Sequence, residues 1–105
     1  MALKHKWQDK AKTDLNDTLD YVFNRFGERT ANKVFSEVSE VVDMLCAFPD
    51  AGSRYGELEF QGNIVRIFHM EKSSIIYSHD DETLIILALW NNRSANPNIP
   101  VIEAK

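Results

Sequence analysis

Three apolar segments separated by short polar breaks, between residues 63 and 93, constrain the fold of this chain more than any other feature. They cover residues 64–70, 74–78 and 84–90. Breaks of a few residues favour antiparallel hairpins, because a parallel connection needs about a dozen residues or more. The last segment is almost continuously apolar, which indicates an interior strand covered on both faces. A small sheet of this kind needs a second layer to pack on.

The first part of the chain supplies that layer as two amphipathic helices. Apolar residues recur at three and four positions over residues 9–26, and Gly27 is suited to end this helix in the left-handed conformation. A wider apolar stripe follows over residues 31–48, with Thr30 as its N-cap. Because so few residues separate the two stripes, the helices are predicted to form an antiparallel hairpin.

The remaining segments complete one α+β domain. Period-two alternation over residues 3–7 predicts a short strand at an edge of the sheet. Residues 52–62 are expected to form a loop with a short extended piece at residues 58–60. We therefore predict the order β-α-α-β-β-β for residues 1–96, with the helical hairpin packed on a small antiparallel sheet. Prolines in residues 97–105 predict an extended C-terminal tail.

Composition excludes several functional classes. Cys46 is the only cysteine among 105 residues, so the chain has no intrachain disulfide and no cysteine cluster for zinc. The net charge of −4 has the wrong sign for a protein that binds by neutralising many phosphates. No apolar run approaches the roughly 20 residues that span a bilayer, and no signal peptide is recognised. We expect a cytoplasmic protein that does not bind membranes.

Motifs for catalysis are scarce in the sequence. It lacks glycine-rich phosphate-binding motifs and the G-x-S-x-G nucleophile motif. His5, His69 and His79 fall on different predicted strands without metal-ligand spacing, so we expect no metal and no cofactor. The closely spaced acidic residues of the first helix are interpreted as a solvated face. They are Asp14, Asp17 and Asp20.

Two places on the predicted strands are candidates for binding. Arg66 lies in an apolar strand, where a charge needs a partner or access to solvent. It is either an arginine that reaches solvent or a ligand for a phosphate or carboxylate on the open face of the sheet. Trp90 and Arg93 end the last strand, where an aromatic ring and a cation can bind a partner chain or nucleic acid. Arg93 could equally cap the rim of the sheet.

A series of short motifs follows the predicted elements in order. The series consists of Trp7 at the end of the first strand, A-x-x-D-L at residues 11–15, Tyr21, F-P-x-x-G at residues 48–52, Arg66, I-I-Y at residues 75–77 and W-x-x-R at residues 90–93. In this order and spacing they resemble the RelE/ParE superfamily, the toxins of type II toxin–antitoxin modules, often described as plasmid stabilisation proteins. The resemblance covers residues 5–96 and implies the same β-α-α-β-β-β fold.

The family divides by target, and this chain departs from the nuclease pattern. The resemblance implies that RelE-like members cut mRNA in the ribosomal A site with basic residues on a sheet face. ParE-like members lack this set and poison DNA gyrase. Here Ser74 stands before Ile75, where a nuclease would carry a basic residue, and no tyrosine follows Arg93. The resemblance is therefore closer to ParE-like members.

The predicted function is that of a ParE-like toxin, which inhibits DNA gyrase by binding and uses Arg66, Trp90 and Arg93 as target-binding positions. The resemblance implies a cognate antitoxin that neutralises the toxin, as a separate small chain in a hetero-oligomer. One alternative is a RelE-like, ribosome-dependent mRNA endonuclease that uses Arg66, Arg93 and His69. Another alternative is an inactive protein with the toxin fold that survives as a binding partner.

Overall fold

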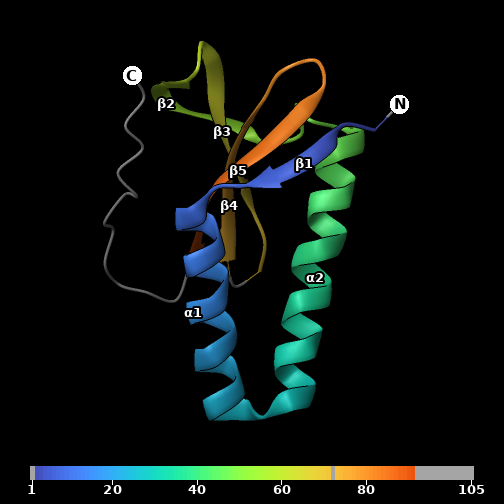
Figure 1. Cartoon of the computed structure of the whole chain (residues 1–105), viewed down its shortest axis with the longest axis vertical. Coiled ribbons are helices and arrows are strands. Elements are labelled where there is room, and N and C mark those ends of the chain that lie inside the picture. Colours follow the sequence, from blue (N-terminus) through green and yellow to red (C-terminus); the bar gives the residue numbers. More distant parts are fainter. Residues whose placement is uncertain (1, 72, 92–105) are drawn as a thin grey trace.

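The computed structural model describes residues 2–71 and 73–91, which form two helices and five strands (Figure 1). In chain order the elements are β1 (Lys4–Trp7), α1 (Asp9–Phe26), α2 (Glu28–Ala47), β2 (Ser53–Phe60), β3 (Asn63–His69), β4 (Ser73–His79) and β5 (Thr83–Asn91). This order confirms the predicted α+β fold and adds one strand, β2, to it. The predicted tail at residues 97–105 lies outside the described residues.

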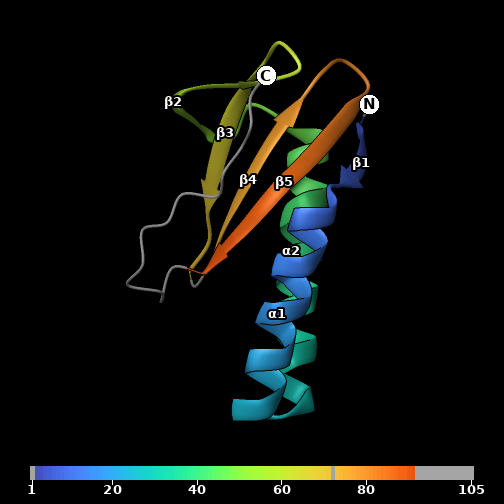
Figure 2. The ribbon, with the colours of Figure 1, turned by 60° about the vertical axis from the view of Figure 1, so that its left-hand side comes forward.

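The strands form one mixed sheet in the order β1-β5-β4-β3-β2 (Figure 2). The pairs β2–β3, β3–β4 and β4–β5 are antiparallel, and the short breaks in the sequence predicted the last two of these pairs. β1 forms the predicted edge but runs parallel to β5, with Lys4 opposite Thr83 and Trp7 opposite Ile86, so the sheet is mixed and not wholly antiparallel as predicted. β5 is consequently an interior strand, which explains its almost continuously apolar sequence.

Strand β2 corrects the prediction of a loop over residues 52–62. Its residues Ser53–Phe60 pair with β3 in an antiparallel register that shifts between Arg54 and Glu59. Gly56 lies in this irregular part with a φ of +62°, a conformation that glycine adopts without strain. The irregularity interrupts the alternation by which strands are recognised, so the sequence predicted only the last part of this strand.

Gly27 alone joins the two helices, a shorter connection than the sequence predicted. Its φ is +93°, its N–H donates to the oxygen of Phe23 at 2.9 Å, and its own oxygen accepts from the Ala31 N–H at 3.1 Å. The same residue therefore ends α1 and begins α2. The predicted N-cap at Thr30 is wrong, because α2 already begins at Glu28.

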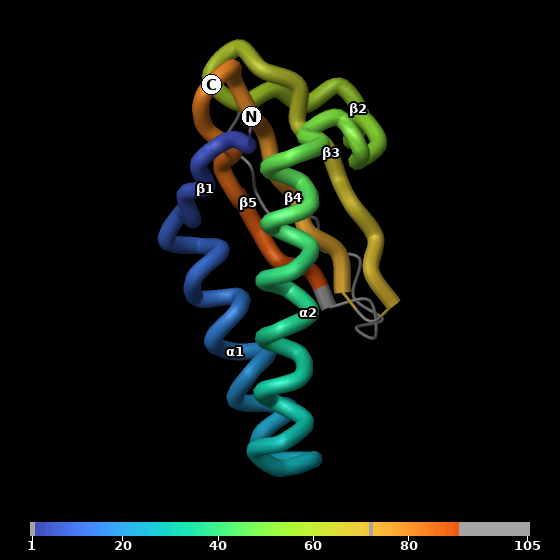
Figure 3. The backbone as a smooth tube through the Cα atoms, turned by 90° about the vertical axis from the view of Figure 1, so that its right-hand side faces the viewer, coloured from blue at the N-terminus to red at the C-terminus, as the bar shows by residue number. Residues whose placement is uncertain are grey.

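The helices cover one face of the sheet, and the main core lies between the two layers (Figures 2 and 3). Both helices, β4 and β5 contribute its buried residues, which are Ala11, Val38, Val42, Leu45, Cys46, Ile75, Tyr77, Leu84, Ile86 and Leu89. A smaller cluster with no residue from either helix consists of Val65, Ile67, Ile76, Leu87 and Ala88. Because side chains alternate along a strand, this cluster marks the outer face of the sheet, turned away from the helices.

The joined ends of α1 and α2 extend past the sheet, as all three views of the backbone show (Figures 1, 2 and 3). Phe23 and Phe26, which belong to the apolar side of the predicted first helix, are 54% and 51% exposed there. Leu15, nearer the sheet, packs against the core. Periodicity thus identified the apolar side of the helix but not how far the opposing layer would extend.

Candidate functional site

The outer face of the sheet carries three non-aliphatic side chains side by side at one end of the strands. Trp90 of β5 lies opposite Ser74 of β4, and Ser74 lies opposite His69 of β3. Ser74 Oγ and His69 Nδ1 share a hydrogen bond of 2.8 Å. Ser74 is buried, His69 is exposed and Trp90 is half-buried against the outer apolar cluster. We call these three residues the outer row.

The outer row is better suited to contact a partner than to perform acid–base chemistry. A serine beside a histidine is only part of a nucleophilic site, which also needs a group to orient the imidazole. Within residues 2–71 and 73–91, no further hydrogen bond or ion pair joins His69 to such a group. Trp90, by contrast, offers a large rigid ring of the kind that dominates protein interfaces.

Arg66 does not belong to the outer row, which corrects the prediction that it lies on the open face of the sheet. It lies opposite Tyr77 of the main core, and Phe68 on its own face packs against that core. Its guanidinium donates to the backbone oxygen of Gly52 at 2.8 Å and lies 3.3 Å from the Asp50 carboxylate. The Arg66 side chain is 20% exposed and holds the turn between α2 and β2.

Two residues of the endonuclease hypothesis, Arg66 and His69, are therefore not brought together in one site. Arg66 and His69 lie three positions apart on β3, so their side chains point to opposite faces of the sheet. Arg93, the third residue of that hypothesis and a proposed target contact, lies outside the described residues.

Tyr77 and Gly52 explain why the F-P-x-x-G motif ends in glycine. The Tyr77 hydroxyl donates to the backbone oxygen of Pro49 at 2.7 Å and accepts from the Gly52 N–H at 2.9 Å. A Cβ at Gly52 would lie 2.7 Å from that hydroxyl and 2.9 Å from the backbone oxygen of Ile67, closer than real Cβ atoms approach. Burial raises the pKa of Tyr77, so the phenol keeps the proton that it donates.

Asp50 and His79 are the residues of this turn that sequence reasoning missed. One Asp50 carboxylate oxygen lies 2.9 Å from His79 Nε2 and 3.3 Å from the Arg66 guanidinium. His79 Nδ1 lies 2.9 Å from the backbone oxygen of Asp80, so both ring nitrogens face acceptors. The hydrogen bond from His79 and then the charge of Arg66 hold the pKa of Asp50 below its ordinary value. A separation of 29 residues between Asp50 and His79 leaves no local sequence signal for this pair.

Asp14 joins α1 to the sheet, which corrects its assignment to a solvated face. Its carboxylate accepts a hydrogen bond from the Leu89 N–H of β5 at 3.1 Å. The pairing of β1 with β5 ends at Ile86, so Asp14 supplies an acceptor where the parallel strand has ended. Asp17 and Asp20 are exposed, as predicted. The A-x-x-D-L motif therefore has a structural reason in this chain.

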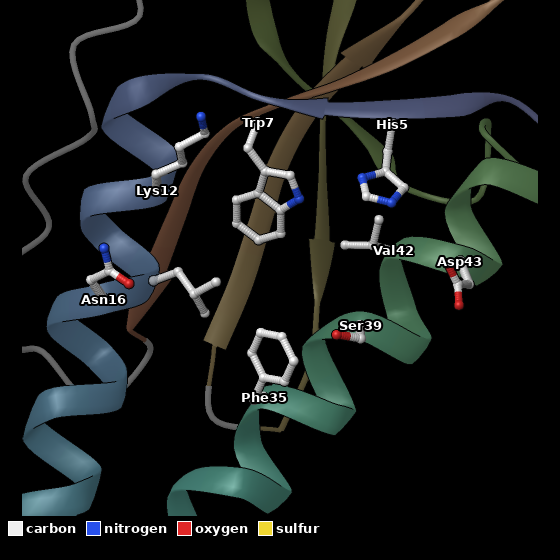
Figure 4. Close-up of a pocket in the computed structure, with 9 residues that line it drawn as sticks. His5, Trp7, Lys12, Asn16, Phe35, Ser39, Val42 and Asp43 are labelled. Carbon is white, nitrogen blue, oxygen red and sulfur yellow. The ribbon is translucent and has the colours of Figure 1, made fainter.

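An apolar groove of about 390 Å³ lies between α1 and α2, where β1 crosses between them (Figure 4). We call it the interhelical groove. His5 and Trp7 reach into it from β1, and Phe35, 49% exposed, faces them from α2 (Figure 4). The complete lining is His5, Trp7, Lys12, Leu15, Asn16, Phe35, Ser39, Val42 and Asp43. Its size and lining suit apolar side chains of a partner.

The described part of the chain offers no site for metal or thiol chemistry. No group of three or more His, Cys, Asp or Glu side chains within it is placed to hold a metal ion. Cys46 is buried, and burial, followed by the nearby charge of Asp43, raises its pKa, which disfavours the reactive thiolate. Neither described helix is long and apolar enough to cross a membrane.

Comparisons with known proteins agree with this architecture. The sequence model of a family described as "ParE toxin of type II toxin-antitoxin system, parDE" matches residues 5–95. A solved structure described as "Chromosomal ParDE TA system from P. aeruginosa" is similar with a TM-score of 0.68 and 24% sequence identity, covering 86% of this chain and 96% of that chain. At that identity the structural likeness supports the fold alone. No curated protein matches the sequence.

Proposed function

Because the chain belongs to the ParE family of type II toxins, we propose that it inhibits DNA gyrase by binding and that a cognate antitoxin neutralises it. The single observation that carries this proposal is the family match, which begins within β1 at residue 5, extends to residue 95 and includes both helices and strands β2 to β5. The similar ParDE structure supports the fold on which this proposal depends.

We assign the target contact to the end of the outer face that carries Trp90. The ring of Trp90 packs on the outer apolar cluster with one side and is half-buried, so a partner can cover the remainder. Arg93 follows in the sequence and is proposed as the second contact. Arg66 contributes indirectly, because its guanidinium holds the turn before β2.

Several observations favour binding over cleavage of mRNA. The buried Ser74 occupies the position where the resemblance to RelE-like members would require a basic residue. Arg66 and His69 point to opposite faces of β3, so they cannot act on one phosphate. The net charge of −4 is also unfavourable for a site that binds ribosomal RNA.

The direct test compares the two activities in parallel with the purified full-length chain. We expect dose-dependent inhibition of DNA supercoiling by gyrase and no cleavage of mRNA in a translation reaction. Addition of the cognate antitoxin should restore supercoiling. Cleavage of mRNA without inhibition of gyrase would support the endonuclease alternative, and the absence of both effects, with no arrest of growth, would support an inactive protein.

Substitution of Trp90 locates the target contact. We expect Trp90→Ala to raise the half-inhibitory concentration about 30-fold, which corresponds to the loss of one interface hot spot of about 2 kcal/mol. Trp90→Phe should retain part of the activity because it keeps an aromatic ring. The matched control is Tyr21→Ala, which removes an aromatic side chain that is 39% exposed on α1. If both alanine variants inhibit gyrase equally well, Trp90 does not touch the target.

A further inference from the structure

A second groove lies on the opposite flank of α2 from the interhelical groove. It is formed by α2 together with Phe68 of β3, the following Met70 and Glu71, and Ser73 at the start of β4, and its volume is about 350 Å³. Figure 3 shows α2 running along the sheet on this side. The two grooves share no lining residue, so α2 is flanked by a separate groove on each side.

The floor of this second groove is apolar. It consists of Val34, Val38, Val41, Phe68 and Met70. Val38 is 2% exposed and the other four residues are half-buried, so the floor belongs partly to the core and partly to the surface. The valines extend over about two turns of α2, or about 10 Å. A partner helix of two or three turns, with apolar residues every three or four positions, matches this length.

The rim of the groove is negatively charged. Glu37, Glu40 and Glu71 line it, all three are exposed, and no basic residue is among the lining residues that the structure describes. Within residues 2–71 and 73–91, none of these carboxylates forms an ion pair. We call it the acidic groove. Its negative rim attracts a cationic segment and disfavours an acidic one, because like charges brought together at an interface are destabilising.

We infer that the acidic groove binds a basic amphipathic helix of the antitoxin. The apolar residues of that helix would cover the valines and Phe68, and its Lys or Arg side chains would lie beside the three glutamates. This inference rests on the proposed function in one respect, because it assigns the helix to the antitoxin. The apolar floor supplies affinity through buried area, and the carboxylates select the charge of the partner and accelerate its association.

Charge reversal on the rim tests the inference. The variant Glu37→Lys with Glu40→Lys is compared with a matched control, Glu57→Lys with Glu59→Lys, which makes the same change of charge on exposed residues of β2. The measurement is the dissociation constant of the full-length chain with its purified cognate antitoxin at several salt concentrations. We expect the groove variant to bind about 10- to 100-fold more weakly at low salt and the control to stay within about threefold of the wild type.

A reciprocal change identifies the partner segment. Cross-linking of the wild-type complex locates the antitoxin segment beside α2, and its Lys and Arg residues are then replaced by Glu. We expect this antitoxin to bind the wild-type chain weakly and to regain affinity for the groove variant. Both chains of every pair are checked by circular dichroism, so that a loss of binding is not confused with unfolding.

Failure of the inference is distinguishable from failure of the proposed function. If the antitoxin binds the wild type and both charge variants equally well, the inference is overturned and the proposed function stands. If the antitoxin does not bind the wild type at all, both are overturned. The groove variant should still inhibit gyrase as the wild type does, and loss of that inhibition would assign the groove to the target instead.

Two other occupants give different results. If the C-terminal part of this chain filled the groove, Ile99→Asp with Val101→Asp would tighten antitoxin binding several-fold. If a second copy filled it, the chain alone would dimerise, and Glu37→Lys with Glu40→Lys would abolish the dimer in sedimentation. Either result would overturn the inference.

Discussion

The two faces of the sheet place polar side chains in opposite situations. On the helix side, Arg66 donates to a backbone oxygen, pairs with Asp50 and is 20% exposed. On the outer face, His69 makes one hydrogen bond with Ser74 and remains exposed. Both residues belong to β3, yet Arg66 holds the turn before β2 and His69 faces solvent. The difference teaches that the face of the sheet on which a polar side chain lies determines its interaction partners, more than the residues next to it in the sequence do.

Gly52→Ala should produce the strongest effect on the helix side. A methyl group there would collide with Tyr77 and with the backbone oxygen of Ile67, so the turn and its hydrogen bonds would have to move. We expect the free energy of unfolding to fall by about 3 kcal/mol. Chemical denaturation measures this free energy, and Gly56→Ala serves as the control. Because nothing lies within 4 Å of a Cβ at Gly56, the control should lose only the roughly 1 kcal/mol that an alanine with positive φ costs. Equal losses in the two variants would mean that the turn adapts to a side chain.

Arg66→Met should weaken the fold without touching the target contact. The substitution keeps an unbranched side chain and removes the donors to Gly52 and the pairing with Asp50. We expect a loss of about 2 kcal/mol in the free energy of unfolding. Arg54→Met, which changes the arginine opposite Arg66 on β2, should stay within about 0.5 kcal/mol of the wild type. If Arg66→Met is as stable as the wild type but no longer inhibits gyrase, Arg66 contacts the target directly.

The Asp50 carboxylate makes the stability of the turn dependent on pH. Because its folded pKa is lowered, its contribution is fully present above the unfolded value of about 3.9 and is lost as pH falls through the lower folded value. Thermal unfolding of the wild type and of Asp50→Asn is therefore followed from pH 6 to strongly acidic conditions. We expect the wild type to have the higher melting temperature at pH 6 and the two melting temperatures to converge at low pH. His79→Ala removes the main cause of the lowered pKa and should reduce that difference at pH 6. A difference that persists unchanged in acid would contradict this network.

His69→Ala should have the smallest effect of the series. The exposed imidazole makes one described hydrogen bond, so the free energy of unfolding should change by no more than about 0.5 kcal/mol. Gyrase inhibition should remain as in the wild type. Loss of an mRNA-cleaving activity in this variant would revive the endonuclease alternative and would make the outer row a catalytic site.

Most of the architecture could be predicted because it depends on periodicity. The alternation in β1, the helical stripes and the short breaks between the last three strands each reflect how side chains repeat along an element. Most of strand β2 was not predicted, because its register shifts in the middle. Thr30 was wrongly predicted as an N-cap, because Gly27 both ends one helix and begins the next. These errors occur where the backbone departs from a regular period.

The candidate site was less predictable, since its geometry depends on contacts between distant residues. Trp90 was placed correctly at the end of β5, but the side-chain partners of Arg66 and Asp14 were not foreseen. Asp14 accepts its hydrogen bond from a residue 75 positions away, and Arg66 reaches a turn 14 to 16 positions earlier. The carboxylates of the acidic groove likewise come from two separate segments, since Glu37 and Glu40 lie on α2 and Glu71 follows β3. The apolar floor that they share is apparent only in the tertiary structure.

The sequence by itself determined the types of element, their order and the antiparallel pairing of the last three strands, because a repeat of two or of three to four residues is a local property of the chain. Only the tertiary structure decided which polar side chains support the fold and which stay available to a partner. A hydrogen bond or an ion pair forms where two groups meet in space, and the packing of the helices on the sheet sets those meetings.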